Sequence, residues 1–174
     1  MKKIITIIVL IILMVVTMSK EEEIIIPKDA IRFRVIANSN DIKDQQEKKK
    51  IAKTLGNNIT ELLKNQNSLQ ETRTTLKKNI DTFTTTVQEE MKNDNYDNNV
   101  KVNYGMNYFP EKTYKGVKYK EGEYESLVVT LGKGEGNNFW CVLFPPLCLL
   151  EAEEDDTNEV EYTSFVKELI DKYF

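Results

Sequence analysis

The chain has 174 residues, with 24 Lys and Arg against 28 Asp and Glu, a length that suits one domain with a buried core. This charge balance gives no overall attraction to nucleic acid or anionic lipid. The chain contains no His, which excludes Ser-His-Asp and Cys-His catalysis and His-ligated metals. We therefore expect a protein that is not an enzyme and that holds no metal or cofactor.

Residues 1–19 have the order of an export signal. Lys2 and Lys3 precede an apolar run over residues 4–16, which is shorter than the roughly 20 residues of a spanning helix. Small residues follow, so cleavage after Ser19 is one interpretation and an uncleaved N-terminal anchor is the other. In both cases we expect the remainder of the chain to be exported and to meet the membrane only through this segment.

Residues 20–29 are mostly polar and include Pro27, so they predict a linker into a domain over residues 30–150. From Ile31 to Asn38, odd-numbered positions are apolar and most even-numbered ones are polar. This period of two predicts a strand with one buried face and with Arg32 and Arg34 on its polar side.

A first helix is predicted after residues 38–41, whose side chains can all accept hydrogen bonds from a first helical turn. It should run to about Lys64. Residues 43–50 are mostly charged, so we expect only the second half to be deeply packed. The apolar stripe of that half comprises Ala52, Leu55, Ile59 and Leu62.

A second helix is predicted from Ser68 to about Lys92. Its stripe recurs at steps of three or four residues and comprises Leu69, Thr72, Leu76, Ile80, Phe83, Val87 and Met91. The Asn- and Asp-rich residues 93–99 then predict a turn that ends the helix.

Three more strands are predicted over residues 100–108, 123–131 and 139–144. The apolar faces of the first two are Val100, Val102, Tyr104, Met106 and Tyr108, and then Leu127, Val129 and Leu131. The glycine-rich residues 132–136 predict a turn and not a phosphate-binding loop, because no helix follows them. The order of elements predicts an α+β fold, with a mixed or antiparallel sheet of about four strands. A helical hairpin, inserted after the first strand, should pack on one sheet face.

The C-terminal part divides into an acidic and an amphipathic segment. Residues 151–161 include seven acids and no base, which predicts a solvated acidic linker. Apolar residues then recur at helical spacing, so we predict an amphipathic helix over residues 162–174.

The two cysteines, Cys141 and Cys148, flank Pro145 and Pro146. In an exported chain such a pair predicts a disulfide, which would fix the shape of the proline turn. Two buried thiols are the alternative, and a nucleophilic cysteine is disfavoured without a His partner.

Two surfaces are candidates for partner binding. One lies at the end of the first strand, and an ion-paired sheet surface is its alternative. The other is an aromatic and proline turn, for which core packing is the alternative. Their members are Arg32, Arg34, Asn38, Asn40 and Asp44 for the first, and Trp140, Phe144, Pro145 and Pro146 for the second.

Longer strings are more specific than these patterns. They are Ile31 to Asn40, Asp44-Gln45, Phe109 to Lys112 with Tyr114, Gly122 to Glu125, and Gly134 to Cys148. Together they resemble the stage II sporulation protein R family over residues 30–150. The chain departs from the family pattern in having Phe139 where a tryptophan is usual and Lys120-Glu121 where Pro-Ala is common.

The resemblance implies an intercellular signal of sporulation, exported from the forespore into the space between the forespore and mother-cell membranes. There, such proteins trigger a membrane-embedded aspartic protease of the stage II sporulation protein GA type. That protease matures the precursor of the mother-cell sigma factor E. We therefore expect this protease as the partner, and no nucleic acid. The alternative is a secreted cell-wall hydrolase that uses Glu123 and Glu125, on one side of a strand, as acid and base.

Overall fold

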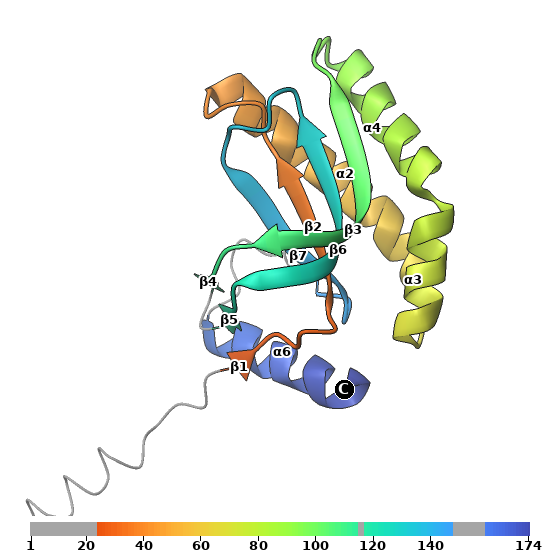
Figure 1. The fold of residues 1–174 in the computed structure, drawn as a ribbon, viewed down its shortest axis with the longest axis vertical. Helices are drawn as coiled ribbons and strands as arrows, with labels where there is room; N and C mark the ends of the chain where they lie inside the picture. Colours follow the sequence, from red (N-terminus) through yellow and green to blue (C-terminus); the bar gives the residue numbers. More distant parts are fainter. Residues whose placement is uncertain (1–23, 115–116, 148–158) are drawn as a thin grey trace, which may run out of the picture.

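A four-stranded mixed sheet lies at the centre of the fold (Figure 1). The structure is a computed structural model that describes residues 24–114, 117–147 and 159–174. Across the sheet, the strands follow the order β3 (Val100–Phe109), β6 (Gly122–Leu131), β2 (Ile31–Ile36) and β7 (Asn138–Phe144). Strands β2 and β6 are parallel, whereas β3 and β7 run antiparallel to their neighbours. The predicted α+β class and mixed sheet are confirmed.

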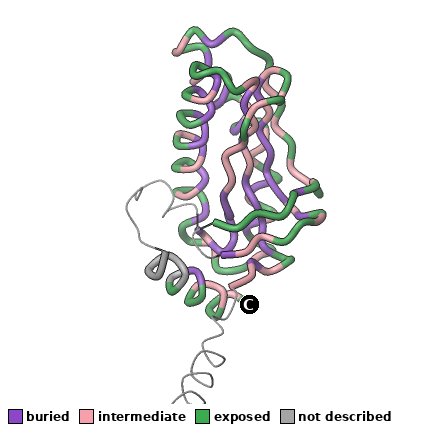
Figure 2. Tube along the Cα trace, turned by 90° about the vertical axis from the view of Figure 1, so that its left-hand side faces the viewer, coloured by how far each residue is buried: buried purple, intermediate pink, exposed green. Residues whose placement is uncertain are grey.

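Three helices between β2 and β3 in the chain cover one face of this sheet: α2 (Ile42–Leu63), α3 (Leu69–Lys78) and α4 (Ile80–Asn93) (Figure 1). The main core lies between the helices and the odd-numbered residues of β2 and β6. Figure 2 shows buried residues along the central strands and on the sheet-facing side of the helices. The insertion of helices after the first strand of this sheet is therefore confirmed.

Helix α2 begins and ends where the sequence predicts, but its packing differs in two ways. Its buried stripe ends on Leu63, four residues after Ile59, and Leu62 is 38% exposed, so the predicted core position of Leu62 is wrong. The first half of the helix is also packed, because Asp44, Glu47 and Lys48 are buried. Charge alone therefore did not identify the solvated side of this helix.

The predicted second helix is two helices, separated at Asn79. The backbone of Asn79 leaves helical geometry (φ −107°, ψ 12°), and its side-chain amide donates to the carbonyl oxygen of Thr75 at 2.7 Å. An asparagine side chain competes in this way for helical carbonyl groups. The predicted stripe survives the break, since Leu76 and Phe83 on either side of it are both buried.

Strand β3 changes the side that it buries near Gly105. Val100, Val102 and Tyr104 pack against the helix-covered core, as predicted. Met106 and Tyr108 are exposed, so their predicted burial is wrong. The paired strands β3 and β6 bend together at this point and extend away from the rest of the sheet (Figure 1). Beyond the bend, Phe109 is fully buried.

A second sheet of three short strands lies at one end of the molecule, in the order β1 (Ile24–Ile25), β5 (Val117–Tyr119) and β4 (Lys112–Tyr114). Residues 24–26, which the sequence places in a linker, belong to the fold: β1 pairs with β5, and Ile26 is buried. This sheet had no periodic signal, because strands of two or three residues are too short to show one.

The C-terminal helix α6 (Glu159–Tyr173) packs beside the second sheet (Figure 1). Its Val166 is fully buried in a second apolar cluster, with Ile26 and Leu147 among its members. None of the helices in the described ranges has the length and apolar character that a bilayer crossing needs. The predicted export signal, Cys148 and most of the predicted acidic linker lie outside the described residues.

Candidate functional site

Arg32 lies on the face of the sheet opposite the helices, and it is only 2% exposed. Its guanidinium carbon is 3.4 Å from the ring centroid of Tyr124, 5.2 Å from that of Phe109 and 5.7 Å from that of Tyr119. Aromatic ring faces attract a cation, and this attraction increases when water is excluded. Burial nevertheless lowers the pKa of Arg32, although Tyr124 and Tyr119 oppose the shift. The sequence predicts that only one face of this strand is buried, and that is wrong, because these rings also cover the side of Arg32.

The guanidinium of Arg32 is incompletely paired. Its Nε and Nη2 atoms are buried without a hydrogen-bond partner, and no carboxylate of the described residues forms an ion pair with it. A buried cation without a counter-ion costs free energy. An anionic group that reached this side chain would therefore be stabilised.

Arg34 continues the same layer. Its guanidinium carbon lies 4.7 Å from the ring centroid of Trp140 and 5.8 Å from that of Phe109. The rings of Trp140 and Phe109 meet edge to face at 5.1 Å. We call this set of Arg32, Arg34, Phe109, Tyr124 and Trp140 the arginine layer. Arg34 belongs to the first predicted partner surface and Trp140 to the second, so the arginine layer brings the two surfaces together.

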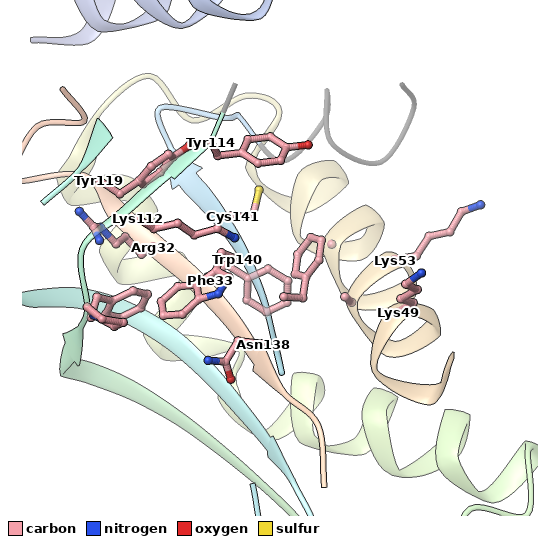
Figure 3. A pocket seen from close by; sticks show the side chains of 15 residues that line it. Arg32, Phe33, Lys49, Lys53, Lys112, Tyr114, Tyr119, Asn138, Trp140 and Cys141 are labelled. Carbon is pink, nitrogen blue, oxygen red and sulfur yellow. The ribbon is translucent and has the colours of Figure 1, made fainter. Parts of the chain in front are cut away.

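A cavity of about 430 Å³ opens beside the arginine layer (Figure 3). Phe139 and Cys141 lie in the core on the helix side of β7, whereas Trp140 lies on the opposite side, yet all three line the cavity. Residues from both faces of a strand can line one cavity only at a free edge of that strand. The cavity therefore wraps around the outer edge of β7, and we call it the β7 groove.

The β7 groove is positively charged. Four of its lining residues are cationic and none is acidic: Arg32, Lys49, Lys53 and Lys112. Lys49 and Lys53 stand on α2 at one side of the groove, and Arg32 and Lys112 stand at the other (Figure 3). Burial, followed by the charges of Lys49 and Lys112, lowers the pKa of the neighbouring Lys48. This crowding of cations favours an anionic occupant.

The predicted site residue Asp44 lies in a hydrogen-bonded cluster away from the groove. Its Oδ2 accepts from the Asn38 amide at 2.7 Å, and its Oδ1 accepts from the Tyr96 hydroxyl at 2.7 Å. Hydrogen bonds from Ser39, Tyr96 and Asn38 outweigh burial and lower the pKa of Asp44. The buried carboxylate is thereby satisfied, which gives Asp44 a structural role at the start of α2.

Asn38 and Asn40 tie the β2–α2 loop to the β6–β7 turn. Asn38 Oδ1 accepts from the backbone N–H of Lys133 at 3.0 Å, and Asn40 Oδ1 accepts from that of Asn137 at 2.8 Å. Residues 132–136 form a turn between two strands, as predicted. The role of Asn38, Asn40 and Asp44 in partner binding stays a prediction, and these contacts give each of them an internal function.

The predicted aromatic and proline turn is divided between core and surface. Phe144 is buried and meets the ring of Tyr173 from α6 at 5.1 Å, and Pro145 is buried too. Pro146 is partly exposed. Cys141 is buried in β7, while Cys148 lies outside the described residues, so their disulfide stays a prediction.

The two carboxylates of the hydrolase hypothesis have different environments. Glu125 accepts from Arg73 Nε at 2.6 Å and from the Tyr104 hydroxyl at 2.9 Å, while Glu123 is exposed. These two contacts tie Glu125 to helix α3 and to strand β3, which gives it a structural role in the fold. Within the described ranges, no group of three or more Cys, Asp or Glu side chains could hold a metal ion.

Comparison with known proteins assigns the chain to a family. The sequence profile described as stage II sporulation protein R matches residues 27–154. The chain belongs to the stage II sporulation protein R family. Stage II sporulation protein R of Bacillus subtilis (strain 168) is 38% identical over 128 residues, which are 74% of this chain and 57% of that relative. No solved structure matches the chain.

The match to the stage II sporulation protein R family includes the whole β7 groove, because every lining residue lies between Arg32 and Cys141. Sequence reasoning identified Arg32 and Trp140 but did not assign Lys49, Lys53 or Lys112 to a site. The spacing of four residues between Lys49 and Lys53 places both on one side of a helix, which was the available signal. No local pattern could bring Lys112 to that helix. Membership of this family gives the chain a role in sporulation.

Proposed function

We propose that this protein is an exported intercellular signal of sporulation that binds and activates a membrane-embedded aspartic protease of the mother cell. The protease, of the stage II sporulation protein GA type, then matures the precursor of sigma factor E. The observation that carries the proposal is the family match over residues 27–154, which includes the central sheet, its helices and the β7 groove. The protein acts in the space between the two membranes, which it reaches through the export signal of residues 1–19.

The proposed mechanism is binding without turnover. A ligand activates an enzyme only if it binds the active conformation more tightly, and a shift from 1:99 to 99:1 requires about 10⁴-fold, or ~5.5 kcal/mol. Interface residues that contribute ~2 kcal/mol or more each are enriched in Trp, Tyr and Arg. The arginine layer and the β7 groove present Trp140, Arg34 and Tyr119 together, so a small contact can supply this difference.

The proposal is tested by gene deletion in the sporulating host, with conversion of the sigma factor E precursor followed by immunoblot. Deletion should block the conversion, and the intact gene should restore it. A matched form of the protein without residues 1–19 should accumulate in the forespore and should not restore the conversion, because this form cannot be exported. Normal conversion in the deletion strain would refute the proposed function.

A further inference from the structure

Strand β7 is an edge strand, and the Leu147 N–H donates to the carbonyl of Val142 near the end of this strand at 3.2 Å. Among the described residues it pairs with β2 alone. In an antiparallel ladder, alternate residues of such a strand direct their backbone N–H and C=O groups outward, away from the sheet. Proteins usually protect an edge with charged residues or proline, and β7 (Asn138–Phe144) contains neither. The part of its outer side that precedes Val142 is therefore a template for another strand.

The β7 groove follows this edge over four consecutive residues, Asn138 to Cys141. At a rise of ~3.3 Å per residue they span about 13 Å, which suits an extended segment. Two buried polar groups among the lining residues lack partners, namely Oδ1 of Asn138 and the Nε and Nη2 atoms of Arg32. An occupant that supplied a donor and an anion would satisfy both.

The charge of the groove decides the chemistry of the occupant. The chain as a whole carries a formal charge of −4, whereas the lining of the groove holds four cations and no acid. Successive side chains of an added strand point to opposite faces. Those on one face would meet Lys49 and Lys53, and those on the other would meet Lys112 and Arg32. Acidic residues therefore fit both faces of an added strand.

We propose that the β7 groove binds an extended acidic segment of the partner protein, which adds to the free edge of β7 as a further strand. Backbone hydrogen bonds to residues 138–141 hold the segment, and its carboxylates pair with Lys49, Lys53 and Arg32. This mode of recognition takes affinity from the backbone and specificity from side-chain contacts. The inference rests on the proposed function, because the partner there is the protease, whose extracytoplasmic part would carry the segment.

Defined peptides test the inference without the protease. The probe is a fluorescent peptide in which pairs of Glu alternate with pairs of Val, so that an extended strand carries carboxylates on both faces. The protein is used as the host secretes it. We expect saturable binding that weakens with added salt, and at least tenfold weaker binding when Lys replaces Glu in the peptide. Binding should also slow amide hydrogen exchange at residues 138–141. Equal binding of the Glu and Lys peptides, or of polyphosphate, would overturn the inference.

Two peptide variants separate strand addition from simple charge attraction. In one, the backbone nitrogens of odd-numbered residues are methylated, and in the other those of even-numbered residues. A strand pairs through one of its edges, so one variant should bind like the parent and the other should lose binding. If both bind equally, the backbone takes no part and the inference is wrong.

Protein variants locate the site. Lys49→Glu combined with Lys53→Glu should weaken binding at least tenfold, whereas Lys78→Glu combined with Lys101→Glu makes the same change of net charge at exposed positions outside the groove and should leave binding intact. Binding seen only after the acids of residues 151–161 are replaced by amides would mean that the chain fills its own groove. That result would contradict an external occupant. The inference fails on these binding data alone, whereas the proposed function fails only if gene deletion leaves conversion of the sigma factor E precursor normal.

Discussion

Substitution of Gly136 by alanine tests the connection between the β6–β7 turn and the β2–α2 loop. A Cβ atom at Gly136 would lie 2.6 Å from the carbonyl carbon of Ser39 and closer still to its oxygen. These are backbone atoms and cannot rotate away as a flexible side chain would. The turn must therefore move away from the loop that contains Asn38 and Asn40.

The cost follows from the hydrogen bonds that this movement breaks. The N–H of Gly136 donates to the Ala37 carbonyl at 2.9 Å, and that of Glu135 donates to the Asn38 carbonyl at 3.1 Å. The third bond joins the Asn137 N–H to Asn40 Oδ1 at 2.8 Å. At ~1 kcal/mol each, Gly136→Ala should lower the free energy of unfolding by about 3 kcal/mol. That is a large part of the ~5–15 kcal/mol typical of a domain.

Gly56→Ala is the matched control, because it makes the same chemical change inside helix α2. Nothing lies within 4 Å of a Cβ atom at Gly56. Alanine is favoured over glycine in a helix by about 1 kcal/mol, so this variant should be more stable than the wild type. Urea unfolding with an unchanged denaturant slope measures both differences. If the two variants have equal stability, the loop and the turn are not held together as the structure indicates.

Two further variants test single carboxylates. Burial, with the nearby Asp94 charge, raises the pKa of Glu47 from 4.5 to about 7, so its contribution to stability is complete below pH 4.5 and is lost as the pH rises through 7. Glu47→Gln should therefore flatten the fall in stability between these pH values and stabilise the protein above pH 7, which urea unfolding across pH measures; an unchanged pH profile would contradict the assignment. Glu125→Gln should cost about 1 kcal/mol by weakening the Arg73 contact, and the secreted variant should still support sigma factor E maturation. A folded, secreted Glu125→Gln protein without signalling would restore the hydrolase hypothesis.

The sequence predicted those elements whose local pattern and tertiary surroundings agree. The alternation from Ile31 to Val35 located β2 because helices do cover that face. The same alternation predicted that only one face of β2 is buried, which was wrong, because residues from β5, from β6 and from the end of β3 cover the side of Arg32. The predicted burial of Met106 and Tyr108 was wrong for a related reason. Strand β3 bends near Gly105, so the side of the strand that is buried changes there, while the period of two in the sequence continues through the bend. The β7 groove has no local signal, since it joins residues that lie far apart in the chain.

The buried charge of Arg32 is explained better by ligand binding than by the stability of the fold. It occupies a central strand that is covered on both faces, where a well-packed apolar side chain is often as stable as a buried ion pair, and an unpaired buried charge is worse than either. Stability therefore gives no reason for a guanidinium at this position, even with the stacking on Tyr124. The rings do, however, hold the guanidinium in one place at the wall of the groove, so little side-chain freedom is lost when an anion arrives. The unpaired guanidinium costs free energy in the free protein, and an anionic ligand removes this cost when it pairs with Arg32. Because the side chain is already ordered, this gain contributes directly to the affinity for the ligand.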